Sequence, residues 1–113
     1  MSNDNNECTR ESLGDYVLVR LRGEVDLSWS QQVRKTILEA LDDSSQVGVE
    51  LSQVSYIDSS GIAALVEGFQ NAREKGTKFG LVAASKAVMA VLQLARLDRV
   101  FPMFPTLEAA RAA

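Results

Sequence analysis

The chain has 113 residues, of which 46% are hydrophobic and 24% are charged, proportions that are ordinary for one soluble globular domain spanning residues 1–113. Its formal net charge of −3 and the scatter of its twelve basic residues argue against nucleic acid or an anionic membrane as the main partner. Because the sequence contains no histidine and a single cysteine, Cys8, it excludes imidazole catalysis, histidine metal ligands and an intramolecular disulfide.

The N-terminal segment MSNDNNE lacks the cationic flank and apolar stretch of a signal peptide. No apolar run along the chain approaches the roughly 20 residues of a membrane span. We therefore expect a cytoplasmic protein without direct membrane insertion. Residues 1–8 are expected to form a flexible polar terminus, although Cys8–Ser12 could add an edge strand.

The first half of the chain predicts two strands separated by a helix. Residues 15–23, DYVLVRLRG, alternate apolar and polar side chains with the period of a strand and end at a glycine. Ser28 or Ser30 is expected to cap the helix that follows. The apolar stripe of that helix consists of Val33, Ile37, Ala40 and Leu41. Residues 46–52, QVGVELS, alternate again, and a short connection through Val54 is expected to follow.

The second half repeats this alternation of helix and strand. Apolar residues recur at helical spacing from Ile62 onward, and residues 78–84, KFGLVAA, predict a short apolar strand. Ser85 can cap a third helix, residues 98–104 are predicted to be extended, and residues 105–113 predict a last short helix. Strands joined by helices of this length favour parallel crossover units in an α/β domain, with room for an antiparallel pair at the N-terminal end.

The segment YIDSSGIA, residues 56–63, places a carboxylate and two hydroxyls where a strand gives way to a helix. The first interpretation is a helix cap, because Asp58 can accept hydrogen bonds from the backbone N–H groups of Ser60 and Gly61. The second makes Ser60 a switch within reach of another protein. Phosphorylation would add about −1.5 to −2 charges, which the free N–H groups and dipole of a helix N-terminus tolerate. Asp58 would oppose that charge by like-charge repulsion. Because the helix N-terminus tolerates the phosphate, the modification would alter docking without unfolding the domain.

Two further segments accompany DSSGI (58–62) and the run VELSQVSYI (49–57) before it. These are LRGEVDL (21–27) and LARLDRVF (94–101). Together, in this order and spacing over about residues 12–110, they resemble the STAS domain family, and most closely its small single-domain anti-sigma factor antagonists. The resemblance implies a STAS-like α/β fold, with a mixed four- or five-stranded sheet and helices packed mainly on one face.

The resemblance also implies a partner-switching function. In that family the unphosphorylated antagonist binds an anti-sigma factor that is itself a serine kinase, which then phosphorylates the antagonist, and a phosphatase resets it. The family's phosphoacceptor is the second serine of the motif, here Ser60. Asp58, Ser59 and Gly61 would flank it at the docking surface, and the match places Asp26 near the same partner surface.

Two alternatives remain open from the sequence. STAS domains also serve as small cytoplasmic subunits of ABC transporters that move lipids, docking on a permease or an ATPase. Trp29 stands where family members more often carry small residues, so its indole is expected either in the core or exposed as a partner anchor. No residue set supports an enzyme, a cofactor or a metal site.

Overall fold

The structure is a computed structural model that describes residues 6–113. Residues 1–5, most of the terminus predicted to be flexible, lie outside the described residues. Glu7 and Cys8, which that prediction also included, belong to the first strand. The edge strand considered for Cys8–Ser12 is therefore present, and it is slightly longer than expected.

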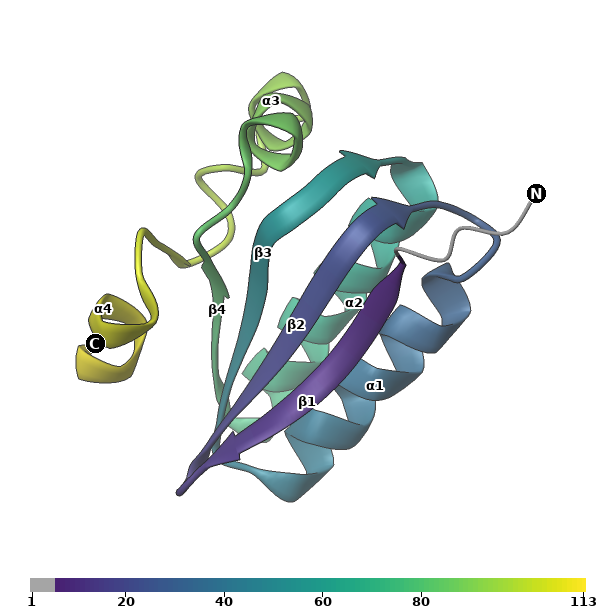
Figure 1. Ribbon diagram of the computed structural model, residues 1–113. Helices are drawn as coiled ribbons and strands as arrows, with labels where there is room; N and C mark the ends of the chain where they lie inside the picture. The colour runs from purple at the N-terminus through teal and green to yellow at the C-terminus, as the bar shows by residue number, and fades with distance from the viewer. Residues whose placement is uncertain (1–5) are drawn as a thin grey trace.

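Five strands form one mixed sheet in the order β1-β2-β3-β4-β5 (Figure 1). The first two are antiparallel, and the other pairs are parallel. The strand bounds are β1 Glu7–Leu13, β2 Tyr16–Val25, β3 Gln46–Ile57, β4 Lys78–Val82 and β5 Met103–Phe104. The predicted α/β fold with a mixed sheet of four or five strands is thereby confirmed.

Four helices connect and cover these strands. Their bounds are α1 Ser30–Asp43, α2 Ser59–Lys75, α3 Lys86–Leu94 and α4 Leu107–Ala112. Figure 1 shows α1 and α2 side by side along one face of the sheet, whereas α4 lies on the other side and α3 beyond one end. None of the helices within residues 6–113 combines the length and apolar character needed to cross a bilayer.

The alternation in β2 divides its side chains between two apolar clusters. Val17 and Val19 enter the main core beneath α1 and α2, while Tyr16 and Leu18 point to the opposite face. There they meet Ala110 of α4 in a second, smaller cluster. Period-two geometry thus buries both faces of this strand near its start, and the chain covers the second face with its last helix.

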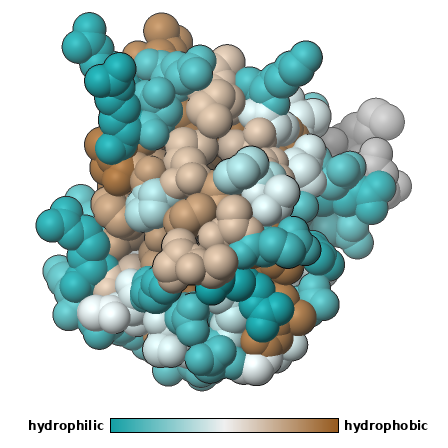
Figure 2. Space-filling model, turned by 90° about the vertical axis from the view of Figure 1, so that its left-hand side faces the viewer, coloured by the Kyte–Doolittle hydropathy of each residue, from teal (hydrophilic) through white to brown (hydrophobic). Residues whose placement is uncertain are grey.

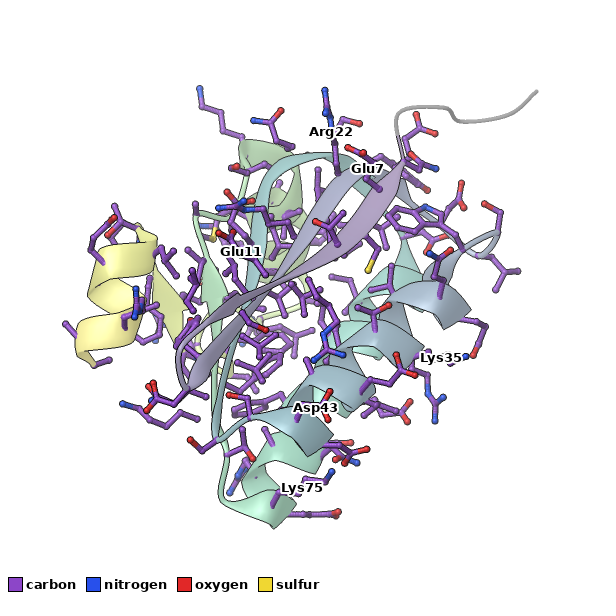
Figure 3. All side chains as sticks on the ribbon, turned by 60° about the horizontal axis from the view of Figure 1, so that its bottom comes forward. Glu7, Glu11, Arg22, Lys35, Asp43 and Lys75 are labelled. Atoms are coloured by element: carbon purple, nitrogen blue, oxygen red, sulfur yellow. The ribbon has the colours of Figure 1, made fainter. Side chains whose placement is uncertain are left out.

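Farther along, the second face of the β1–β2 hairpin carries charged side chains. An ion pair joins Arg20 to Glu11 at 2.9 Å and another joins Arg22 to Glu7 at 3.2 Å. Figure 3 shows Glu7, Glu11 and Arg22 along this hairpin. Because all four side chains are substantially exposed, these pairs mark a solvated surface and contribute little to stability.

Three local predictions are wrong. The helix after β2 begins at Ser30 with Trp29, not Ser28 or Ser30, at the N-cap position, and an indole cannot accept the free backbone N–H groups there. No connection interrupts the chain at Val54, since β3 continues unbroken to Ile57. Only the end of the segment 98–104 is a strand, because the chain makes a turn at Asp98–Val100.

Candidate functional site

The candidate site lies where the parallel strands β2 and β3 end together. Val25 and Ile57 are register partners, and the N–H of Asp58 donates to the C=O of Val25 at 3.1 Å. This pairing sets the β2–α1 loop, residues 26–29, beside the first turn of α2. The carboxyl ends of parallel strands are a common location for binding sites in open sheets.

Asp58 is the N-cap of α2, as predicted. Its Oδ1 accepts from the backbone N–H of Ser60 at 2.9 Å and of Gly61 at 3.1 Å, and the Ser60 hydroxyl donates to the same oxygen at 2.6 Å. The Ser60 hydroxyl chiefly holds the pKa of the Asp58 carboxyl below its ordinary value. Partial burial opposes this lowering of the pKa, and the backbone N–H groups of Gly61, Ser60 and Leu27 add to it.

The two serines of the motif differ in accessibility and in partners. Ser59 is exposed, whereas Ser60 is half-buried and its Oγ donates to Asp58. With its proton directed at a carboxylate, the Ser60 oxygen accepts no hydrogen bond from residues 6–113. Ser60 is therefore a hydroxyl held in one orientation at the surface.

Gly61 is buried, because the start of α2 packs against the two strand ends. A Cβ at this position would lie 2.7 Å from Cγ1 of both Ile57 and Val25, and 3.0 Å from the Val25 carbonyl oxygen. The absence of a side chain allows the helix start to approach β2 and β3 closely. The structure thus places Gly61 beneath the predicted docking surface.

We expect Gly61→Ala to lower the free energy of unfolding by about 1 kcal/mol. Overpacking against Val25 and Ile57 costs about 1–3 kcal/mol, and the better helix propensity of alanine offsets about 0.5–1 kcal/mol of this. Urea denaturation measures the difference. Ser59→Ala, an exposed change in the same turn, is the control and should shift stability by less than about 0.5 kcal/mol. Equal effects of the two variants would contradict the packing role.

The β2–α1 loop is ordered by its own polar and aromatic side chains. The half-buried Asp26 accepts hydrogen bonds from the N–H and the hydroxyl of Ser28. The Trp29 indole N–H donates to the backbone C=O of Glu24, and its ring is half-buried against the main core. Of the two expectations for Trp29, packing against the core and exposure as a partner anchor, the structure shows the first. Asp26 lies on a loop that is ordered next to Asp58.

Sequence reasoning missed two exposed apolar side chains beside the site. The side chain of Leu27 is 73% exposed, and its backbone N–H contributes to lowering the pKa of Asp58. Tyr56, on the strand leading into Asp58, is 50% exposed. The signal for Leu27 was its position between Asp26 and Ser28, past the point where the strand alternation ends. Exposed apolar residues next to oriented polar groups are typical of protein-binding surfaces.

Metal binding finds no support in residues 6–113. No three side chains of His, Cys, Asp or Glu converge there in a way that could hold an ion. The site therefore offers a held hydroxyl, a capping carboxylate and an apolar margin, a combination suited to protein docking.

Comparison with known proteins places this arrangement in a family. A model of the STAS domain matches residues 8–110. A Mycobacterium tuberculosis protein that carries the name of an anti-anti-sigma factor is 28% identical over 105 residues, which cover 90% of this chain and 71% of that protein.

Solved structures share the whole architecture. An anti-sigma factor antagonist from Mycobacterium paratuberculosis superimposes with a TM-score of 0.87 and 27% identity, covering 98% of this chain and 95% of that one. The unphosphorylated form of SpoIIAA, from Bacillus, has a TM-score of 0.79 at 24% identity and covers 93% of each chain. At 24% identity, the likeness to SpoIIAA shows a shared fold alone.

Proposed function

Because the chain belongs to the STAS domain family, we propose that it is a cytoplasmic anti-sigma factor antagonist switched by phosphorylation of Ser60. In its unphosphorylated form it binds an anti-sigma factor that is a serine kinase, and this kinase then transfers phosphate from ATP to Ser60. A phosphatase restores the binding form. The catalysis belongs to these partners and needs no cofactor in this chain. The Ser60 hydroxyl, held by Asp58 at 2.6 Å at the surface, is the observation that carries the proposal.

Phosphorylation would change the site at one hydrogen bond. The hydroxyl that donates to Asp58 would become an ester oxygen, which cannot donate, and about −1.5 to −2 charges would appear beside a carboxylate. The N-terminus of α2 can stabilise an anion through its free N–H groups and its dipole. The domain would remain folded, while any partner covering Ser60 would have to desolvate a phosphate.

The proposed docking surface consists of Asp26, Leu27, Tyr56, Asp58, Ser59 and Ser60. Gly61 supports this surface from below, because it is buried and lets α2 approach the strand ends. Leu27 and Tyr56 supply apolar area, and the aspartates supply charge at its margin. Leu27 is the outermost of these apolar side chains and is the one whose removal tests the surface.

Leu27→Ser is expected to weaken binding to the anti-sigma factor about tenfold while changing stability by less than about 0.5 kcal/mol. The matched control is Leu94→Ser, which removes a leucine 88% exposed on α3 and should leave the affinity unchanged. Isothermal titration calorimetry measures both. If Leu94→Ser weakened binding and Leu27→Ser did not, the docking surface would lie elsewhere.

The direct test of the proposed function is phosphate transfer. The chain is incubated with ATP and a serine-kinase anti-sigma factor from its own genome, and the product is mapped by mass spectrometry. Phosphate is expected on Ser60, still on Ser60 in Ser59→Ala, and absent from Ser60→Ala. Modification of Ser59 instead, or of Ser60→Ala as readily as the parent, would refute the assignment.

The alternative function is a cytoplasmic subunit of a lipid ABC transporter, docked permanently on a permease or an ATPase. No feature of residues 6–113 favours it, and the Mycobacterium relatives described above carry names from the anti-sigma pathway. Parallel pull-downs with wild-type and Ser60→Asp baits separate the two functions. Retention of a permease or ATPase by both baits would support the transporter role and contradict the switch.

A further inference from the structure

The edge of β4 leaves backbone groups without a neighbouring strand. The N–H of Lys78 donates to Ser45, on the side of β3, whereas the N–H of Leu81 donates to Pro102, on the side of β5. Because alternate residues of a parallel strand direct their backbone groups to opposite edges, the N–H and C=O of Phe79 point away from β3. Among the described residues, β5 pairs only with Leu81 and Val82, so no strand lies beside Phe79.

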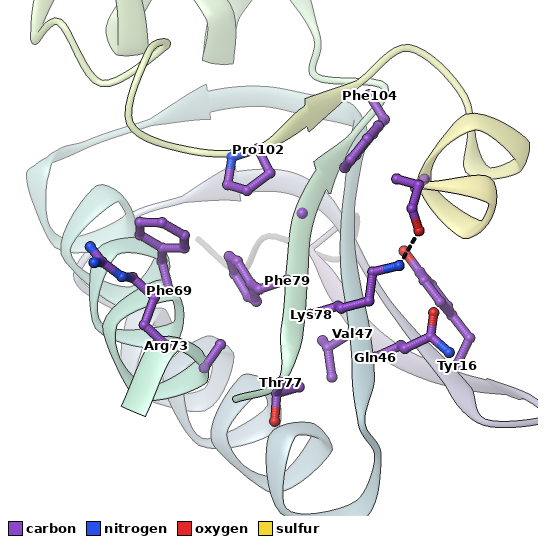
Figure 4. A pocket seen from close by; sticks show the side chains of 14 residues that line it. Tyr16, Gln46, Val47, Phe69, Arg73, Thr77, Lys78, Phe79, Pro102 and Phe104 are labelled. Carbon is purple, nitrogen blue, oxygen red and sulfur yellow. Dashed lines mark hydrogen bonds between the residues drawn. The ribbon is translucent and has the colours of Figure 1, made fainter. Parts of the chain in front are cut away.

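An apolar pocket of about 290 Å³ opens at this unpaired edge. Figure 4 looks onto it and shows Phe79 directed toward Phe69 of α2 on one side of β4, with Tyr16 and Phe104 on the other. Pro102 closes the pocket where β5 begins. The pocket therefore continues the line of β5 along the edge of β4.

The charge at the rim of the pocket is positive. Arg73 is exposed, its guanidinium carbon lies 5.8 Å from the centroid of the Phe69 ring, and it takes part in none of the ion pairs formed within residues 6–113. Lys78 is engaged, because its ammonium donates to the backbone oxygen of Ala113 (Figure 4). Of the two basic residues that line the pocket, Arg73 is thus the one left for an acidic ligand.

The opposite edge of the sheet lacks these properties. The outer strand β1 is exposed over most of its length and carries Glu7, Arg10 and Glu11. Charged side chains on an edge strand discourage the addition of another strand.

Figure 2, which views the side of the molecule carrying α3 and α4, shows apolar surface between polar margins. The β4 edge lies between α4 and α2, and its pocket is lined mainly by apolar side chains.

We propose that the β4 edge at Lys78–Gly80 binds an extended peptide segment of a partner protein. One residue of that segment pairs its own C=O and N–H with the N–H and C=O of Phe79, which adds a strand to the sheet. An adjacent apolar side chain enters the pocket beside Phe69, and an Asp or Glu nearby contacts Arg73. An extended backbone satisfies both polar groups of Phe79 at once.

This groove is separate from the proposed switch. Ser60 lies in the first turn of α2 and Arg73 lies near its end, about 20 Å away along the helix at 1.5 Å per residue. A peptide in the groove and a protein over Ser60 can therefore bind together. The groove gives the domain a second attachment point that Ser60 does not control.

The test uses a displayed library of random ten-residue peptides and the full chain. Enriched peptides are expected to alternate apolar residues and to carry at least one Asp or Glu. Arg73→Glu should weaken their binding at least about fivefold by placing like charges together. The control Lys35→Glu, the same charge change on the exposed face of α1, and Ser60→Asp should each leave their affinity within about twofold.

Amide hydrogen exchange locates the bound peptide. In the free chain the Phe79 amide should exchange at least about tenfold faster than that of Gly80, and the bound peptide should protect it selectively. The proposal is overturned if no peptide is enriched, if enriched peptides bind Arg73→Glu as well as the parent, or if the new protection falls outside Lys78–Gly80.

Discussion

Ser60→Asp is expected to weaken binding of the chain to its kinase anti-sigma factor about a hundredfold, a loss of about 2.7 kcal/mol. The substitution replaces a hydroxyl that donates to Asp58 at 2.6 Å with a second carboxylate at the centre of the proposed docking surface. A partner that covers this position would have to desolvate an unpaired charge. Isothermal titration calorimetry with the purified anti-sigma factor measures the affinity of both forms.

The same substitution should leave the domain folded. Placing a carboxylate next to Asp58 removes one hydrogen bond and adds repulsion, while the N-terminus of α2 favours a negative charge by about 0.3–1 kcal/mol. We expect a net change in stability of less than about 1 kcal/mol. Thermal unfolding of the variant therefore separates a loss of binding from a loss of structure.

Ser59→Asp is the matched control for this prediction. Ser59 is exposed, belongs to the same helical turn and makes no side-chain hydrogen bond to Asp58 within the described part of the chain. The same added charge should reduce the affinity less than about fivefold at this position. Equal losses for both variants would show that net charge, and not the place of Ser60, governs binding.

Asp58→Ala is expected to lower the free energy of unfolding by about 2 kcal/mol, the upper range for an N-cap. The carboxylate accepts two backbone N–H groups and the Ser60 hydroxyl, so its removal leaves these donors without their acceptor. Urea denaturation at pH 7 measures the loss. Glu74→Ala, an exposed change near the other end of α2, should cost less than about 0.5 kcal/mol.

The contribution of Asp58 should also depend on pH in a defined direction. Its pKa in the folded chain lies below the ordinary value of 3.8, chiefly because of the Ser60 hydroxyl, so folding favours the charged form. The stabilisation is then complete above the unfolded pKa and is lost as the pH falls through the folded pKa. A stability gap between the parent and Asp58→Ala that stayed constant from pH 7 to about pH 3 would contradict this role of the charge.

The sequence predicted the elements whose signals are local. The alternation of residues 15–23 predicted β2, and Asp58 was predicted as a cap because its partners lie two and three residues ahead. The end of β3 was missed because its pairing with β2 shifts register between Arg20 and Arg22 and again between Gly23 and Glu24. Such irregularities change which residues face the core, and single-strand alternation does not reveal them.

The parts of the site that depend on tertiary packing were less accessible to sequence reasoning. The nearness of Asp26 to Asp58 follows from the pairing of β2 with β3, which the resemblance to a family supplied and local patterns did not. The exposure of Leu27 and the pocket beside Phe79 depend on where neighbouring elements lie. Helix capping is decided over a few residues, whereas a surface is assembled from distant ones.

The most direct measurement compares the affinity of the chain for its kinase anti-sigma factor before phosphorylation, after stoichiometric phosphorylation of Ser60, and after phosphatase treatment. We predict a loss of about a hundredfold on phosphorylation and full recovery when the phosphate is removed. An unchanged affinity of the Ser60-phosphorylated chain, with the modification verified by mass spectrometry, would contradict the switch.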